Sequence, residues 1–265
     1  MKQRMSSEFI YQLFALLIAI IVVHALYVGF IRPAAKAHIE EEAALHAAGK
    51  EVVATRSLAV VIGDYEQESC FILLIWALAI MGYKSRRGMH EREMLDRRLL
   101  DIPEGTTVLP QDAREYSRAL EALPDAEQDY LLPRTLLSAL QRFATTGSIQ
   151  AVSDTIKENC EIESERLDSE MSMVRYIAWA IPSIGFIGTV RGIGDALGQA
   201  YKAVEGDISG VTVSLGVAFN STFVALVLSI ILMFCLHQLQ LSQERLVLNC
   251  QRYADKRLLR FLVAH

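Results

Sequence analysis

The chain has 265 residues, of which 52% are hydrophobic, and its formal net charge is −5 at pH 7. A soluble domain carries about 45–50% apolar residues, and the excess lies in a few blocks, which indicates an integral membrane protein. No basic run is long enough, or sufficiently interleaved with aromatic residues, to indicate nucleic-acid binding.

The first apolar block predicts a membrane-spanning helix near the start of the chain. Residues 9–30 are mostly Leu, Ile, Val and Ala, and about 20 such residues cross the hydrocarbon layer. Lys2 and Arg4 precede the block, so a cleaved signal peptide is the alternative. The apolar run is long for a signal peptide, and we therefore assign residues 1–31 to a retained signal anchor.

A second and shorter apolar block covers residues 70–83, which reach only ~21 Å as a helix. The alternative is a buried helix of a soluble domain. Charges flank the block, with acids before it and bases after it: Asp64, Glu66, Glu68, Lys84, Arg86 and Arg87. We therefore predict a second span over 70–83 and a periplasmic loop over 32–69.

Residues 174–238 hold two further apolar blocks, joined only by the polar connection 200–210. This spacing predicts a third and a fourth transmembrane helix that form an antiparallel hairpin. The helical pattern before the third span has no breaker until Pro182, so we expect one continuous helix there. The fourth span continues as a polar pattern, which predicts a cytoplasmic C-terminal helix over 239–265.

Lysine and arginine near the ends of the spans predict the orientation, because cytoplasmic loops carry an excess of both. Residues 84–100 hold six of these cations, and the connection 200–210 holds one. The predicted fold is therefore an all-α integral membrane protein with four transmembrane helices and a helical cytoplasmic domain over 84–173. The third and fourth spans extend into the cytoplasm, where both termini lie. Glu93 and Arg97 are expected to pair four residues apart on a cytoplasmic helix.

No motif for catalysis, a cofactor or a metal is present. The sequence lacks a Walker-type loop, HExxH and GxSxG. The four cysteines are scattered, without CxxC or histidine at ligand spacing, and are interpreted as reduced and structural: Cys70, Cys160, Cys235 and Cys250. We therefore predict that the protein is not an enzyme and holds no metal or cofactor.

The stretch "GFIGTVRGIG" at residues 185–194 interrupts the third span with small residues. Gly185, Gly188 and Gly192 share one helix face, and small residues let membrane helices approach closely. The fourth span carries a matching stripe of small side chains: Ser214, Ala218, Thr222, Ala225 and Ser229. Packing between helices is the simplest interpretation of these residues.

Two threonines fall at one level of the hairpin. Thr189 lies 10 residues before Gln199 and Thr222 lies 11 residues after Val211, which places both ~15–17 Å from the outer end, near the bilayer midplane. Their hydroxyls either form a narrow polar surface around another helix or bond to carbonyls of their own helices.

Arg191 and Asp195 are ionisable residues inside the third span, four residues apart. Such groups face the bundle interior or water and often pair. A mutual salt bridge is the structural interpretation, and a gating role in an ion pathway is the functional one.

The stretch "PSIGFIGTVRGIGDAL", followed by "GVAFNSTFVALVLSI", resembles the paired third and fourth helices of the MotA/TolQ/ExbB proton-channel family. The matching residues are Pro182, Gly185, Gly188, Thr189, Val190, Gly192 and Ile193, then Gly216, Ala218 and Thr222. Four spans are typical of MotA, whereas the GTVxGI pattern is closer to TolQ and ExbB. Arg191 stands at a position that is commonly uncharged in the family.

The resemblance implies a function. It implies a homo-pentamer in the bacterial inner membrane, around two copies of a single-span MotB/TolR/ExbD-like partner whose aspartate carries the proton. It also implies that Thr189 and Thr222 line the ion pathway and that Pro182 kinks the third helix. A structural scaffold without ion conduction is the alternative. The resemblance leaves open the process that is energised and whether the ion is H⁺ or Na⁺.

Overall fold

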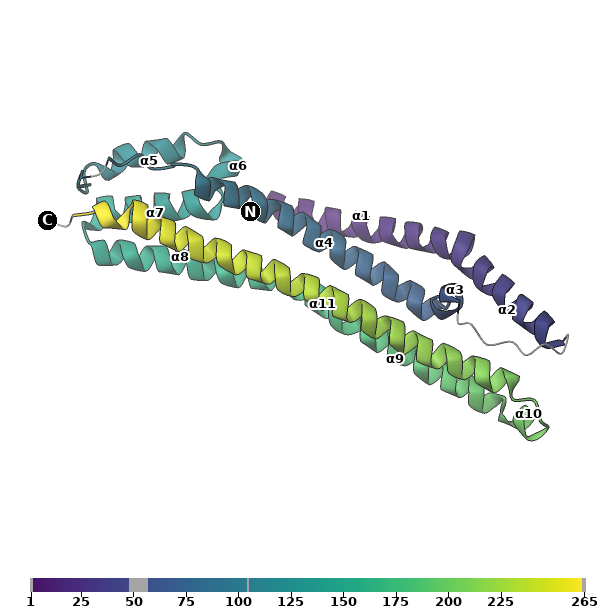
Figure 1. The fold of residues 1–265 in the computed structure, drawn as a ribbon. Helices are drawn as coiled ribbons and strands as arrows, with labels where there is room; N and C mark the ends of the chain where they lie inside the picture. The colour runs from purple at the N-terminus through teal and green to yellow at the C-terminus, as the bar shows by residue number, and fades with distance from the viewer. Residues whose placement is uncertain (1, 48–56, 104, 264–265) are drawn as a thin grey trace. The chain divides into compact units, whose positions relative to one another are not determined.

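The computed structural model describes residues 2–47, 57–103 and 105–263, in which every named element is a helix (Figure 1). The elements are α1 (Lys2–Leu26), the π-helical η1 (Tyr27–Ile31), α2 (Arg32–Ala47), α3 (Leu58–Val61), α4 (Tyr65–Asp96), α5 (Ala113–Glu121), α6 (Asp125–Gln128), α7 (Leu131–Thr146), α8 (Ile149–Glu170), α9 (Ser172–Gly198), α10 (Ala200–Val204), α11 (Ser209–Arg257) and the 3₁₀ turn η2 (Leu259–Phe261).

Four helical stretches of the described residues are long and apolar enough to cross a membrane. They are Glu8–Glu41, Tyr65–Asp96, Ile149–Gly198 and Ser209–Phe261. Each of the four predicted spans lies within one of these stretches. The predicted fold class, an all-α integral membrane protein with four spanning helices, is confirmed.

The helices extend beyond the apolar blocks. α4 covers 32 residues, although the predicted span is only 70–83, because its polar flanks are rich in good helix formers such as Glu, Arg and Met. Residues 32–47 of the predicted periplasmic loop form α2, where Pro33 occupies the first turn and is tolerated there. Residues 48–56 of that loop lie outside the described residues.

The helix expected to run without interruption into the third span is present as one helical stretch of 50 residues, Ile149–Gly198, in which the turn residue Met171 keeps a right-handed helical backbone. One local expectation needs correction. α4 ends at Asp96, so Arg97 lies outside the helix and its Nη1 pairs with Glu127 Oε2 at 3.0 Å. The expected pair of Arg97 with Glu93 therefore gives way to a partner from another element.

The chain divides into two compact units. Unit 1 comprises Met1–Gly82 and Met173–Leu236, and it contains the four apolar blocks apart from the last residues of the second and the fourth. Large side chains of α9 and α11 point outward from this unit, since Trp179 is 71% exposed and Phe223 is 63% exposed. Such a surface is expected where lipid, rather than water, surrounds the helices.

Unit 2 comprises Tyr83–Ser172 and His237–His265, and it is built around a core of large apolar side chains. α7 contributes the centre of this core through Leu136, Leu140 and Phe143, all fully buried. α7 ends at Gly147, whose φ of +60° is a left-handed conformation that glycine adopts without a steric penalty. Ser148 then caps α8 by accepting a hydrogen bond from the Ala151 amide at 3.3 Å.

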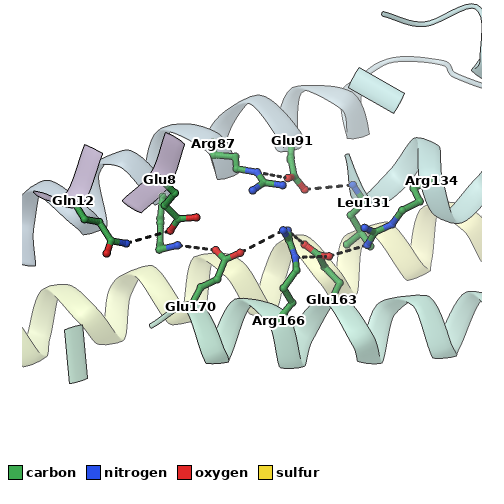
Figure 2. Close-up of polar contacts among 10 residues, drawn as sticks. Glu8, Gln12, Arg87, Glu91, Leu131, Arg134, Glu163, Arg166 and Glu170 are labelled. Atoms are coloured by element: carbon green, nitrogen blue, oxygen red, sulfur yellow. Dashed lines mark hydrogen bonds and ion pairs between the residues drawn. The ribbon is translucent and has the colours of Figure 1, made fainter. Parts of the chain in front are cut away.

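A chain of alternating charges also runs through unit 2 (Figure 2). Lys84 Nζ lies 2.8 Å from Glu170 Oε2, and Glu170 Oε1 lies 3.3 Å from Arg166 Nη1. Arg166 is bonded to Glu163, which also accepts a hydrogen bond from Arg134 at 2.8 Å. Glu163 is only 1% exposed. We call these five residues the ion ladder.

Candidate functional site

The hairpin of α9 and α11 is held together by glycine against small side chains. A Cβ atom added to Gly192 would lie 2.8 Å from both the backbone nitrogen and the Cβ of Ala218. One added to Gly188 would lie 2.6 Å from the Ser221 Cβ, and one on Gly185 would collide with Ala225. The two backbones are therefore so close that only glycine fits on the α9 side.

Two further glycines of the third span, Gly194 and Gly198, lie on a different face of α9. A Cβ on Gly194 or on Gly198 would meet nothing within 4 Å. Only the face with Gly185, Gly188 and Gly192 packs on α11. The stripe of small residues on α11, from Ser214 to Ser229, is the other side of this contact rather than an open polar groove.

The structure brings the two predicted threonines together. The hydroxyls of Thr189 and Thr222 are hydrogen-bonded to each other. Thr189 Oγ1 lies 3.0 Å from the carbonyl oxygen of Ala218, and Thr222 Oγ1 lies 3.2 Å from that of Gly185. Each hydroxyl thus bonds the carbonyl that lies four residues before the other threonine. Thr189 Oγ1 also lies 3.3 Å from the Gly185 carbonyl of its own helix, so its single proton has an acceptor within the helix and another across it.

This pair has more acceptors than protons. Each hydroxyl carries one proton, whereas two carbonyl oxygens and the two hydroxyl oxygens can all accept. Rotation of the hydroxyls therefore switches between several hydrogen-bonded arrangements while α9 and α11 stay in place. The site combines a fixed backbone with mobile protons.

Pro182 lies inside α9, where it leaves one backbone acceptor without its usual donor. Proline has no N–H, so the carbonyl of Ala178, four residues earlier, loses its helical partner. Ser229 of α11 replaces that donor, because its hydroxyl donates to the Ala178 carbonyl at 3.1 Å. The expected site of a kink is thus also a cross-link between the two helices.

α4 reaches the same contact through a buried glutamine. Gln67 has no exposed surface, and its side-chain amide donates to the Val61 carbonyl at 3.1 Å. The same nitrogen lies 3.4 Å from Ser221 Oγ, directly beside Thr222 in the sequence. Gln67 was not among the residues predicted from the sequence, although a glutamine among the acids before a span was a signal that could have found it.

Arg191 has a different principal partner from the one expected. Its guanidinium donates two hydrogen bonds to the Glu66 carboxylate, at 2.7 and 2.9 Å. Asp195, the predicted partner, lies farther away at 3.9 Å, and Asp64 lies at 4.0 Å. Burial raises the pKa of the Asp64 carboxyl, and the nearby Arg191 acts against that rise. Arg191 therefore fastens α9 to the start of α4.

A second carboxylate at the start of α4 joins the first span. The buried Glu68 lies 2.7 Å from His24 Nδ1 and is also bonded to Arg32. The Arg32 guanidinium lies 4.2 Å from the centre of the Tyr65 ring, a cation–π distance. The acids before the second block, which the sequence showed only as a charged flank, thus hold helices on both sides of α4.

Residues 127–252 match the family model of the MotA/TolQ/ExbB proton channel family. Over these residues, which are just under half of the chain, the protein is similar to the MotA/TolQ/ExbB family. The match contains α9 with both Thr189 and Pro182, and it contains Thr222 on α11, so the resemblance seen in the sequence is confirmed. The first two spans of the chain precede the matched region. No curated protein and no solved structure matches the chain.

The described residues offer neither a cluster of metal ligands nor a disulfide. In the part of the chain that the structure describes, no three histidine, cysteine or acidic side chains are grouped to hold a metal ion. All four cysteines are free, in keeping with their interpretation as reduced thiols. That the protein needs no metal or cofactor stays a prediction.

Proposed function

We propose that this protein is the ring-forming subunit of an ion-motive membrane motor, with Thr189 and Thr222 in the path of the ion. The hydrogen-bonded threonine pair, at the tightest contact of the family-matched hairpin, is the observation that carries this proposal. The ion is a proton in this proposal. The complex contains five copies in the bacterial inner membrane, with both termini cytoplasmic.

The chemistry of the pair supports a role beside a titrating acid. A hydroxyl both donates and accepts, so it can bond a carboxylate and also a protonated carboxylic acid. A valine of nearly the same shape can do neither. Threonine is therefore suited to a site where a neighbouring group gains and loses a proton.

The acid itself comes from a partner in this proposal. Asp195 is the only carboxylate of α9, and α11 has none before Glu244, so neither helix supplies an acid at the level of the threonines. A single-span partner with a membrane aspartate, in two copies and of the MotB/TolR/ExbD kind, supplies it. The flow of protons then moves the ring against the partner, which performs mechanical work.

A structural scaffold is the second candidate, and one observation favours it. The packing of glycines on α9 against small side chains of α11 already accounts for the close contact of the two helices. We call the face of α9 with Gly185, Gly188 and Gly192 the glycine seam. A scaffold needs this seam but not the hydroxyl protons. The two candidates therefore differ in what happens when the hydroxyls are removed and the shape is kept.

The deciding experiment purifies the complex gently from its host membrane and combines native mass spectrometry with proton flux in liposomes. We expect five copies with two copies of a single-span protein. Thr222→Val should lower the flux at least ten-fold while the assembly stays intact, and Thr222→Ser, which keeps the hydroxyl, should retain most of it. An oligomer that never carries a partner, or full flux in Thr189→Val and Thr222→Val, would overturn the motor and leave the scaffold.

A further inference from the structure

Unit 2 contains a hollow of about 520 Å³ between the end of α4 and the end of α11. Arg92 and Asp96 of α4 line one side of it. The α11 side presents Arg252, Tyr253, Lys256 and Arg257. We call this hollow the basic cleft. All of these residues belong to unit 2, so the cleft lies within one compact body.

The charges in the basic cleft are unbalanced. Four cations face one carboxylate, Asp96. Among the described residues, none of the four cations forms an ion pair like those that join the cations of the ion ladder. Unit 2 therefore pairs the charges of the ion ladder. The four cations of the basic cleft are exposed and accessible to a ligand.

Helix stability does not account for all four cations. Lys256 and Arg257 lie in the last turn of α11, where positive charge interacts favourably with the helix dipole. Arg92 and Arg252 lie outside the last turns of their helices. Arg252 and Lys256 are moreover four residues apart on one helix, a spacing at which like charges repel. An anion bound in the cleft would relieve this repulsion.

One wall of the basic cleft is fixed in place. The hydroxyl of Tyr253 accepts a hydrogen bond from the Leu99 amide at 3.1 Å and donates one to the Arg97 carbonyl at 3.1 Å. These two hydrogen bonds fix the position of the Tyr253 ring in the absence of a ligand. The volume also falls within the range of about 300–1,000 Å³ that is typical of small-molecule sites, which favours a small anion.

We propose that the basic cleft binds the phosphate group of a small molecule, with Arg92 and Arg252 as the principal contacts. A guanidinium presents paired donors that match phosphate oxygens, and a lysine adds a mobile point charge. A soluble phosphorylated metabolite and a phospholipid headgroup share this chemistry. The site is independent of the threonine pair, because it uses other residues and lies in the other unit.

The first test measures binding of ATP and of inorganic pyrophosphate to the full chain in nanodiscs of neutral phosphatidylcholine, by calorimetry. We expect saturable binding that weakens at least ten-fold in the double variant Arg252→Gln/Lys256→Gln. The matched control is Arg245→Gln/Arg260→Gln, which removes two exposed cations outside the cleft and should bind like the wild type. Circular dichroism checks that all variants keep their helices.

A second arm distinguishes the two sources of phosphate. Nanodiscs that contain phosphatidic acid are washed, and the lipid that remains on the purified chain is measured by mass spectrometry. Retention that is lost in Arg252→Gln/Lys256→Gln, without binding of either soluble probe, assigns the cleft to a lipid headgroup. Absence of saturable binding in both arms, or equal weakening in the cleft variant and its control, would overturn the proposal.

Discussion

The helices inside unit 1 and the helices inside unit 2 are held together by different kinds of contact. In unit 1, α9 and α11 meet through glycine, alanine and serine, and the bonds between them run from hydroxyls to backbone carbonyls. In unit 2, leucine and phenylalanine fill the centre, and carboxylates pair with guanidinium groups. Both units are helical, so the contrast concerns the side chains between helices.

The surroundings of each unit explain the contrast. Lipid is as apolar as leucine, so burying large apolar side chains gives no driving force within a membrane, and close packing of small residues takes its place. Water supplies that driving force for unit 2. At the start of α4 in unit 1, Glu66 bonds Arg191 and Glu68 bonds His24. This contrast predicts which substitutions lower the stability of unit 1 and which lower that of unit 2.

The largest effect is expected at the centre of the ion ladder. Glu163→Gln leaves Arg134 and Arg166 without their shared carboxylate, which should lower the free energy of unfolding of unit 2 by about 3 kcal/mol. Both tryptophans, Trp76 and Trp179, lie in unit 1. Urea unfolding should therefore shift the loss of helix seen by circular dichroism but leave the transition in tryptophan emission in place.

The control for this prediction is Glu165→Gln, which changes an exposed residue of the same helix and should unfold like the wild type. A shift of the tryptophan transition equal to that of the helical signal would show that the two units unfold together. The contrast between them would then hold for their contacts but not for their stability.

The glycine seam should give the next largest effect. Gly192→Ala forces a methyl group against the Ala218 backbone and should destabilise unit 1 by about 2 kcal/mol. Gly194→Ala, two residues away with open space around it, should change stability by less than about 0.5 kcal/mol. Tryptophan emission during thermal unfolding compares the two. Equal effects would mean that the seam is not what holds α9 to α11.

A smaller effect is expected where Ser229 replaces the missing donor of Pro182. Ser229→Ala leaves the Ala178 carbonyl without a partner and should cost about 1 kcal/mol. Pro182→Ala restores an N–H that can donate to the same carbonyl. In that background Ser229→Ala should cost less than half as much, which a double-mutant cycle measures. An unchanged cost in both backgrounds would contradict the proposed exchange of donors.

The smallest effect concerns the exposed pair of Arg97 and Glu127, whose side chains are 52% and 25% exposed. Such surface pairs contribute little, so Arg97→Gln should lower the stability of unit 2 by no more than about 0.5 kcal/mol. The same denaturant titration as for Glu163→Gln measures it. A loss as large as that of Glu163→Gln would mean that burial does not decide the strength of ion pairs in this unit.

The sequence predicted the parts of the site that follow from counting along a helix. The level of Thr189 and Thr222 comes from the rise per residue, and the shared face of the glycines comes from the helical period. Both arguments use only the geometry of a single helix. For this reason they locate residues on an element but do not say which neighbour they meet, beyond the short turn of the hairpin.

Contacts between distant segments could not be predicted in that way. Asp195 was the expected partner of Arg191 because it is four residues away, whereas Glu66 is 125 residues away in the chain. The bond from Ser229 to Ala178 spans 51 residues. Hydropathy, likewise, located the apolar part of α4 but not the ends of the helix.

The crossed bonds of the threonine pair have a mechanical consequence. Each hydroxyl is tied to the carbonyl one turn before the other threonine, so the two bonds point in a reciprocal way across the hairpin. Sliding α9 along α11 by a single residue, about 1.5 Å, would break both bonds at once. The pair thus fixes the register of α9 against α11, and the two helices are expected to move as one rigid body.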